Sequence, residues 1–237
     1  MKITNSLVSL GIIISSCTNI EKKNFNHSNS ATAKKELNPL TKDSSNQIDE
    51  FKIIPMDVSM LPKEIKYQGK IKQVLRWHDK LGVNIVITSE TGGYHNPKIH
   101  HENDGTDAEV FAYHYLVTKN QIIKSWRVHD FIYDCPVDYD ATFLDNTFQL
   151  TDLNKNGIGE IWLMYKTVCH GDVSPYEMKI ILYEGKTKYA MRGQNKVEVS
   201  PGEFHGGEFK FDKNFSDGPK EFKDFAKNLW NKNIMQS

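Results

Sequence analysis

The sequence has few cysteines, no excess of charge of either sign and no hydrophobic run long enough to span a membrane. Its 237 residues include 3 cysteines, and 30 Lys and Arg balance 30 Asp and Glu. The absence of a basic stripe argues against nucleic acid as a partner. A membrane-spanning helix needs about 20 apolar residues, and no run of that length occurs. No internal repeat indicates a propeller.

The first residues have the parts of an export signal. Lys2 gives a positive start, and residues 7–14 form a short apolar run. The run ends in Ile14-Ser15-Ser16-Cys17, which resembles the lipobox of bacterial lipoproteins. We therefore expect residues 1–16 to be a signal peptide and Cys17 to carry acyl chains such as palmitate, which hold the protein on the membrane. An ordinary secretory signal or an uncleaved apolar start are the alternatives.

The composition changes after the lipobox. Residues 17–50 are rich in Asn, Ser, Thr, Lys and Asp, and they hold too few apolar residues to offset the entropy of ordering. They are predicted to be a flexible tether, with a loop packed on the domain as the alternative. Residues 51–237 are long enough for one β-rich domain with a sizeable core. The expected location is the cell envelope, with a lipid anchor in the outer membrane.

The two cysteines beyond the lipobox are Cys135 and Cys169. In an oxidising envelope they are expected to pair as a disulfide. Two buried free thiols, or a thiol that binds metal, remain the alternatives, because the sequence does not give the distance between the two Cα atoms.

Most of the domain reads as β-strand. Short β-branched or alternating runs between turn residues predict strands at 83–88, 108–116, 121–128, 161–168, 178–183, 188–192 and 209–211. Residues 121–128 are expected to form a hairpin with the preceding strand. After Pro219, apolar residues at helical spacing from Phe222 to Trp230 predict an amphipathic helix that packs on the sheet. The fold class is therefore mainly β (α+β), an antiparallel sheet domain with a C-terminal helix.

The sharpest local signal is the loop 152–160, Asp-Leu-Asn-Lys-Asn-Gly-Ile-Gly-Glu. Alternate oxygen ligands with glycine at the sixth position suit Ca²⁺. The loop resembles the calcium loops of FG-GAP repeats, although a twelfth-position glutamate is missing because Leu163 stands there. The expected ligands of a structural Ca²⁺ are Asp152, Asn154, Asn156, Ile158 and Glu160. An ordinary hairpin turn without metal is the alternative.

Other clusters of chemically active residues are less specific. His100-His101-Glu102, with Asp104 and Asp107, matches no known metal spacing and is expected to be a solvated loop. Cys169 and His170 would point to opposite faces of a strand, which argues against a nucleophile and base. The tryptophans in apolar runs are expected in the core rather than on sugar rings; they are Trp77, Trp126 and Trp162.

Several segments share one pattern: Trp77, the turn at residues 90–92, Ala108-Glu109, Trp126-Arg127-Val128, and the segments 162–175, 178–185 and 188–193. Together they resemble a family of Gram-negative envelope lipoproteins assigned to surface polysaccharide biosynthesis. The resemblance covers roughly residues 75–193. It implies a role in making, exporting or displaying surface polysaccharide, with surface glycan or its assembly machinery as the partner. It brings no catalytic residues with it.

Two classes of function follow. The first is a non-catalytic accessory or binding lipoprotein, favoured by the lipid, the tether and the lack of a catalytic signature. The second is an envelope glycan hydrolase that uses paired carboxylates such as Asp134, Asp138 or Asp172. Two acids at a suitable separation in one cleft would favour the hydrolase, and unperturbed acids would favour the accessory role.

Overall fold

The structure is a computed structural model that describes residues 51–235. Strands make up 51% and helices 12% of these residues, and the strand pairs are antiparallel. The predicted mainly β fold with a C-terminal helix is therefore confirmed. The predicted signal peptide, the lipidated Cys17 and the tether lie outside the described residues. No helix in residues 51–235 is long and apolar enough to span a membrane.

The first sheet has five strands, and each pairs with its neighbours in sequence. They are β1 (Lys52–Ile54), β2 (Lys70–Asp79), β3 (Gly82–Glu90), β4 (Thr106–Val117) and β5 (Ile122–Cys135). The β4–β5 pair contains a bulge at Ser125, because His114 pairs with Trp126 while Tyr115 pairs with Lys124. The predicted hairpin after residue 117 is confirmed.

The second sheet has six strands in the order β13-β10-β9-β8-β6, and β7 pairs with β8. The strands are β6 (Tyr139–Phe143), β7 (Gln149–Thr151), β8 (Glu160–Cys169), β9 (Glu177–Glu184), β10 (Thr187–Gln194) and β13 (Phe209–Phe211). The chain passes from the first sheet to the second between β5 and β6. The runs predicted at 161–168, 178–183, 188–192 and 209–211 are strands of this sheet.

The remaining elements are short except for one helix. They are the 3₁₀-helix η1 (Val58–Met60), the hairpin of β11 (Lys196–Ser200) and β12 (Glu203–Gly206), and the helices α1 (Lys213–Asp217) and α2 (Lys220–Asn233). Pro219 was expected at the first helical position, but it is the N-cap of α2, and the helix begins one residue later at Lys220. Its fixed φ and missing N–H suit a helix start equally well there.

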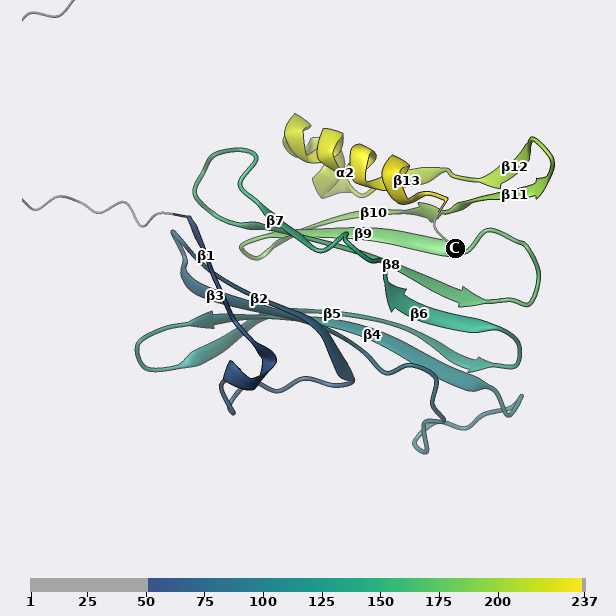
Figure 1. Ribbon diagram of the computed structural model, residues 1–237, viewed down its shortest axis with the longest axis horizontal. Coiled ribbons are helices and arrows are strands. Elements are labelled where there is room, and N and C mark those ends of the chain that lie inside the picture. The colour runs from purple at the N-terminus through teal and green to yellow at the C-terminus, as the bar shows by residue number, and fades with distance from the viewer. Residues whose placement is uncertain (1–50, 236–237) are drawn as a thin grey trace, which may run out of the picture. The chain divides into compact units, whose positions relative to one another are not determined.

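The two sheets stack face to face, and α2 covers the far side of the second sheet (Figure 1). The inter-sheet core contains Val110 and Ala112 from β4 and Leu163 from β8. The helix-side core contains Trp162 from β8 and Trp230 from α2. Strands β8, β9 and β10 are therefore buried on both faces, which explains why they are nearly continuous apolar runs.

The outer face of the first sheet has its own apolar cluster. Phe111, Tyr113 and Tyr115 point to this face, so the predicted alternation of β4 is confirmed. Residues 55–68 cover one part of the cluster: Gln68 donates its backbone N–H to the Tyr113 hydroxyl at 3.2 Å, and the Tyr115 hydroxyl donates to the Lys66 carbonyl. The part of the face beyond this cover carries polar groups.

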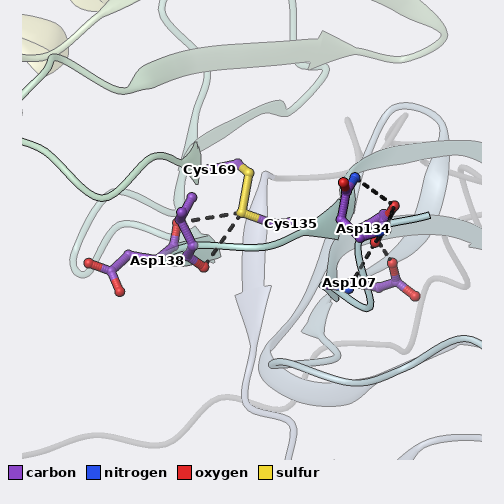
Figure 2. The surroundings of a disulfide bond; sticks show 8 residues. Asp107, Asp134, Cys135, Asp138 and Cys169 are labelled. Carbon is purple, nitrogen blue, oxygen red and sulfur yellow. Dashed lines mark hydrogen bonds between the residues drawn. A yellow bond between two sulfur atoms is a disulfide. The ribbon is translucent and has the colours of Figure 1, made fainter. Parts of the chain in front are cut away.

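A disulfide ties the two sheets together. Cys135 ends β5 in the first sheet and Cys169 ends β8 in the second, and their Cα atoms lie 5.8 Å apart. Figure 2 shows the bond beside Asp138, whose carbonyl oxygen lies 3.6 Å from the Cys135 Sγ. Cys169 is thus not free to act as a nucleophile beside His170.

Candidate functional site

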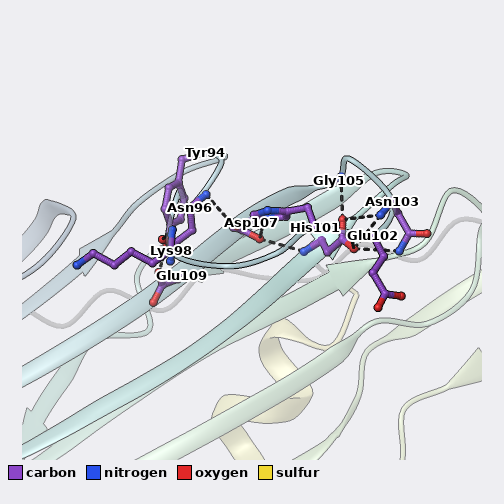
Figure 3. A network of polar contacts seen from close by, with 10 residues as sticks. Tyr94, Asn96, Lys98, His101, Glu102, Asn103, Gly105, Asp107 and Glu109 are labelled. Carbon is purple, nitrogen blue, oxygen red and sulfur yellow. Dashed lines mark hydrogen bonds and ion pairs between the residues drawn. The ribbon is translucent and has the colours of Figure 1, made fainter.

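The long loop between β3 and β4, residues 91–105, lies at the outer face of the first sheet. Asp107 at the start of β4 is fully buried and fixes this loop. Its carboxylate accepts from the backbone N–H groups of Asn96 at 2.8 Å and Asp134 at 2.9 Å, and it pairs with His101 Nε2 at 2.8 Å. Figure 3 shows Asp107 between Asn96 and His101. Burial raises the pKa of Asp107, but these hydrogen bonds outweigh it and hold the pKa below its usual value.

A second carboxylate fixes the end of the same loop. Asp134, with φ of 51°, accepts from the backbone N–H groups of Glu102 at 2.9 Å, Asn103 at 3.0 Å and Gly105 at 2.8 Å. Partial desolvation raises its pKa, but the hydrogen bonds from Gly105, Asn103 and Glu102 dominate and lower it. The loop that flanks the site is therefore fixed by two ionised carboxylates.

Glu109 is the centre of the polar cluster on this face. It lies two residues after Asp107 on β4 and therefore on the same side of the sheet. Its side chain is 9% exposed. One oxygen accepts from the Tyr94 hydroxyl, and the other lies 2.5 Å from His129 Nε2. Burial, and then the hydrogen bond to Glu109, raise the pKa of Tyr94, so that its hydroxyl stays protonated.

Basic groups border this cluster. Arg127 and His129 alternate along β5 and both contact the buried Phe111 ring: the Arg127 guanidinium lies 5.3 Å from its centroid, and the His129 ring stacks on it at 4.6 Å. A hollow of about 450 Å³ opens between them and the loop, and Lys98 lies on its wall. The full lining is Gln68, Tyr94, Asn96, Lys98, Glu109, Arg127, His129 and Tyr133. We call this hollow the outer-face pocket.

Two exposed aromatic side chains of β5 adjoin the pocket, and one of them, Tyr133, also belongs to its lining. Phe131 is 46% exposed and Tyr133 is 37% exposed. Their rings stack on each other at 4.1 Å, and Phe131 also lies 5.4 Å from the His129 ring. The face thus combines the Glu109 carboxylate, the cationic groups of Arg127 and Lys98, and an exposed apolar surface. A ligand that carries hydroxyl groups on an apolar ring face has the complementary chemistry.

The predicted calcium loop lies between β7 and β8. Asp152 Oδ2 accepts from the Gly157 N–H at 3.2 Å across the loop, while Asp152 Oδ1 is buried and has no hydrogen-bond partner among the described residues. Glu160 accepts from the Thr151 hydroxyl at 2.6 Å and from the Leu153 N–H at 2.8 Å. Burial raises the pKa of Glu160 in spite of these bonds.

The remaining ligand candidates bond to groups that the spacing did not indicate. The amide nitrogens of Asn154 and Asn156 donate to Glu184 at 2.6 Å and 2.5 Å, and the Ile158 N–H donates to Asn156 Oδ1 at 2.8 Å. Lys80 donates to the Asn156 carbonyl. No group of three or more His, Cys, Asp or Glu suited to a metal occurs within residues 51–235. One observation, the unpartnered Asp152 Oδ1, fits a cation; the hydrogen bonds of Glu160 fit the metal-free turn.

Two of the carboxylates considered for hydrolysis, Asp134 and Asp172, are poorly suited to be a general acid, which needs a raised pKa. The pKa of Asp134 is lowered, as described above. Hydrogen bonds from Ser174 lower the pKa of the exposed Asp172. Asp138 is exposed, and its carbonyl oxygen accepts from the His170 N–H at 3.1 Å.

No family model matches the chain, and no curated protein or solved structure matches it at a significant level.

Sequence reasoning missed how the histidine-rich loop is built. The expectation of a solvated loop was wrong for two of its residues, because the side chains of His101 and Asp107 are 3% and 0% exposed. It also missed the link between Glu109, Tyr94 and His129, which are 15 and 20 residues apart in sequence. The alternation of residues along β4 places Glu109 and Phe111 on the same face, and this was the one signal in the sequence for the cluster. Their partner on β5, His129, depends on the register of the two strands, which the sequence does not give.

Proposed function

We propose that the protein is an envelope-anchored lipoprotein whose domain binds surface glycan in a non-catalytic, accessory role in surface polysaccharide biosynthesis or display. The observation that carries this proposal is the outer-face pocket with its adjoining aromatic pair, Phe131 and Tyr133. Exposed stacked rings beside fixed hydrogen-bonding groups provide both parts of sugar recognition, an apolar platform and polar groups that set orientation.

The charges of the pocket support binding. Glu109 is already paired with Tyr94 and His129, so it orients these groups. Arg127 and Lys98 contribute positive charge that suits acidic or hydroxyl-rich sugars. The two carboxylates that fix the loop, Asp107 and Asp134, have lowered pKa values, which suits anchoring rather than proton donation.

The test is the affinity of the purified protein for surface polysaccharide from its own cells, measured by calorimetry. Phe131→Ala/Tyr133→Ala should weaken binding at least about tenfold, since truncation of hot-spot residues typically costs about 2 kcal/mol or more, and about 1.4 kcal/mol is already tenfold. Phe204→Ala is the matched control, because this ring is 40% exposed but lies on β12. Equal affinity of both variants and wild type would contradict the proposal. Shortening of the glycan during the incubation would favour the hydrolase alternative.

We also propose that Cys17 is the lipid attachment site, on the basis of the lipobox resemblance at Ile14-Ser15-Ser16-Cys17. Labelled palmitate should be incorporated into the wild-type protein and not into Cys17→Ala. Normal labelling of the variant would contradict a lipid anchor at this residue.

The third proposal is a structural Ca²⁺ in the loop 152–160. Asp152 Oδ1 supports it, because a buried carboxylate oxygen without a partner is costly and an oxygen-binding cation would satisfy it. Asp152, Asn154, Asn156, Glu160 and the Ile158 carbonyl would hold the ion. When bound, the ion would supply the positive charge that attracts these oxygen ligands, and it would thereby hold the β7–β8 turn in place.

A further inference from the structure

A second cavity lies at one end of the inter-sheet space, away from the outer-face pocket. The turns of the β2–β3 and β9–β10 hairpins contribute Leu81 and Gly185, and β4 contributes Leu116 and His114. Its volume is about 370 Å³ and its lining is mainly apolar. That volume lies within the range of small-molecule sites, roughly 300–1,000 Å³. The full lining is Leu81, His114, Leu116, Ser125, Ile158, Glu184, Gly185, Lys186 and Thr187.

A chain of buried hydrogen bonds determines how His114 presents its ring nitrogens. Asp79, which is 1% exposed, accepts from Trp77 Nε1 at 2.8 Å, from the Gly159 N–H at 2.9 Å and from Asn84 Nδ2 at 2.9 Å. The second hydrogen of Asn84 Nδ2 is donated to the Gly82 carbonyl at 2.8 Å. Both amide hydrogens are therefore used, and the amide oxygen of Asn84 is the group that faces His114.

The remaining oxygen defines the tautomer of the imidazole. Asn84 Oδ1 lies 2.9 Å from His114 Nε2 and has no hydrogen to give, so Nε2 must carry the proton and donate. Burial lowers the pKa of His114 to about 4, with Asp79 opposing the shift, and the ring is neutral at neutral pH. Nδ1 consequently carries a lone pair. It is buried and has no hydrogen-bond partner among the described residues.

Packing prevents the ring from turning away. The His114 ring is held between Trp77, at 5.6 Å, and Trp126, at 5.1 Å, with interplanar angles of 22° and 25°. The β-bulge residue Ser125 lies beside it and also lines the cavity. Bulges are over-represented where a strand must re-aim side chains at a functional site. The ring that carries the unpartnered acceptor is thus held in a fixed position, and His114 belongs to the lining of an apolar cavity.

We propose that this cavity binds a small apolar molecule through one hydroxyl group that donates a hydrogen bond to His114 Nδ1. The apolar lining accommodates the body of the molecule, and the lone pair of Nδ1 accepts only from a donor. A carbonyl or ether oxygen at the same position would find no hydrogen to accept. Phenol is the smallest probe with this combination, and anisole is its matched partner because it has a similar shape and no hydroxyl hydrogen.

The inference does not rest on the proposed glycan function, and its test has a separate readout. The full chain is labelled with ¹⁵N-histidine, and long-range ¹H–¹⁵N spectra are recorded at pH 7 during titration with phenol or anisole. The His114 Nδ1 resonance should begin in the range of an unprotonated nitrogen and move saturably with phenol. Anisole should bind at least tenfold more weakly.

Two variants complete the design. Leu116→Phe narrows the cavity while His114 stays in place, and it should weaken phenol binding at least tenfold. His114→Phe keeps an aromatic ring between the tryptophans and should make phenol and anisole bind alike. No saturable movement of Nδ1 with phenol would overturn the proposal. Equal responses to phenol and anisole in the wild-type protein would overturn it too, as would phenol binding that Leu116→Phe leaves unchanged.

Discussion

Removal of the Cys135–Cys169 disulfide should destabilise the domain by about 4 kcal/mol. The two cysteines are separated by 34 residues, and loop-closure entropy for a loop of this length gives about 4 kcal/mol at 25 °C. The bond joins the end of β5 to the end of β8. The effect acts mainly on the unfolded chain, which gains conformations when the link is absent.

Urea unfolding of wild type and of Cys135→Ala/Cys169→Ala, followed by fluorescence, measures this effect. Wild type reduced with dithiothreitol is the control and should match the double variant within about 1 kcal/mol. Thiol titration of the oxidised, unfolded wild type should find neither Cys135 nor Cys169 free. A free thiol at these positions, or a loss of stability below about 1 kcal/mol in the double variant, would refute the reasoning.

Three further predictions follow from single side chains. Burial lowers the pKa of His114 to about 4 from 6.5. The free energy of unfolding is therefore highest above pH 6.5 and falls towards pH 4, because the unfolded chain binds a proton in this range that the folded protein does not. Urea unfolding should show a fall of up to about 3 kcal/mol in this free energy, and His114→Phe should remove it. Millimolar Ca²⁺ should raise the melting temperature of wild type but not of Asp152→Asn; equal shifts would exclude a site at Asp152. Trp230→Ala should lower the free energy of unfolding, measured in urea, by about 3–5 kcal/mol, because this side chain of α2 is fully buried against the second sheet. A Trp230→Ala cost comparable to that of the exposed Lys227→Ala would show that the helix contributes little.

The elements that could be predicted are those in which the sequence pattern of apolar residues matches the residues that the fold buries. Strands β8, β9 and β10 have apolar neighbours on both faces, so their residues form short apolar runs that the sequence displays directly. Helix α2 buries Phe222, Ala226 and Trp230 on one face, which is the spacing that predicted it. In both cases the local signal and the tertiary environment agree.

The strand β2 could not be predicted in the same way. Its sequence mixes Lys70, Lys72 and Arg76 with buried Trp77 and Asp79, so neither an apolar run nor a clean alternation is visible. Asp79 is buried because Trp77, Asn84 and Gly159 satisfy its oxygens. Such compensation depends on residues up to 80 positions away, which the local pattern does not reveal.

The outer-face pocket was hidden for a related reason. Glu109 meets His129 because β4 and β5 pair in a register that a bulge shifts by one residue. Phe131 and Tyr133 were not distinguishable from core aromatics, since exposure depends on which face of β5 is covered. The tryptophans, in contrast, were correctly expected in the core: Trp77, Trp126 and Trp162 are 2%, 8% and 0% exposed.

The surface polysaccharide profile of a deletion strain tests the central claim most directly. The profile is compared by gel with that of strains complemented by wild type, by Phe131→Ala/Tyr133→Ala and by the control Phe204→Ala. The account predicts a lost or shortened glycan ladder that wild type and the control restore and the double variant does not. An unchanged ladder in the deletion strain, or full restoration by the double variant, would contradict a role of this face in surface polysaccharide biosynthesis or display.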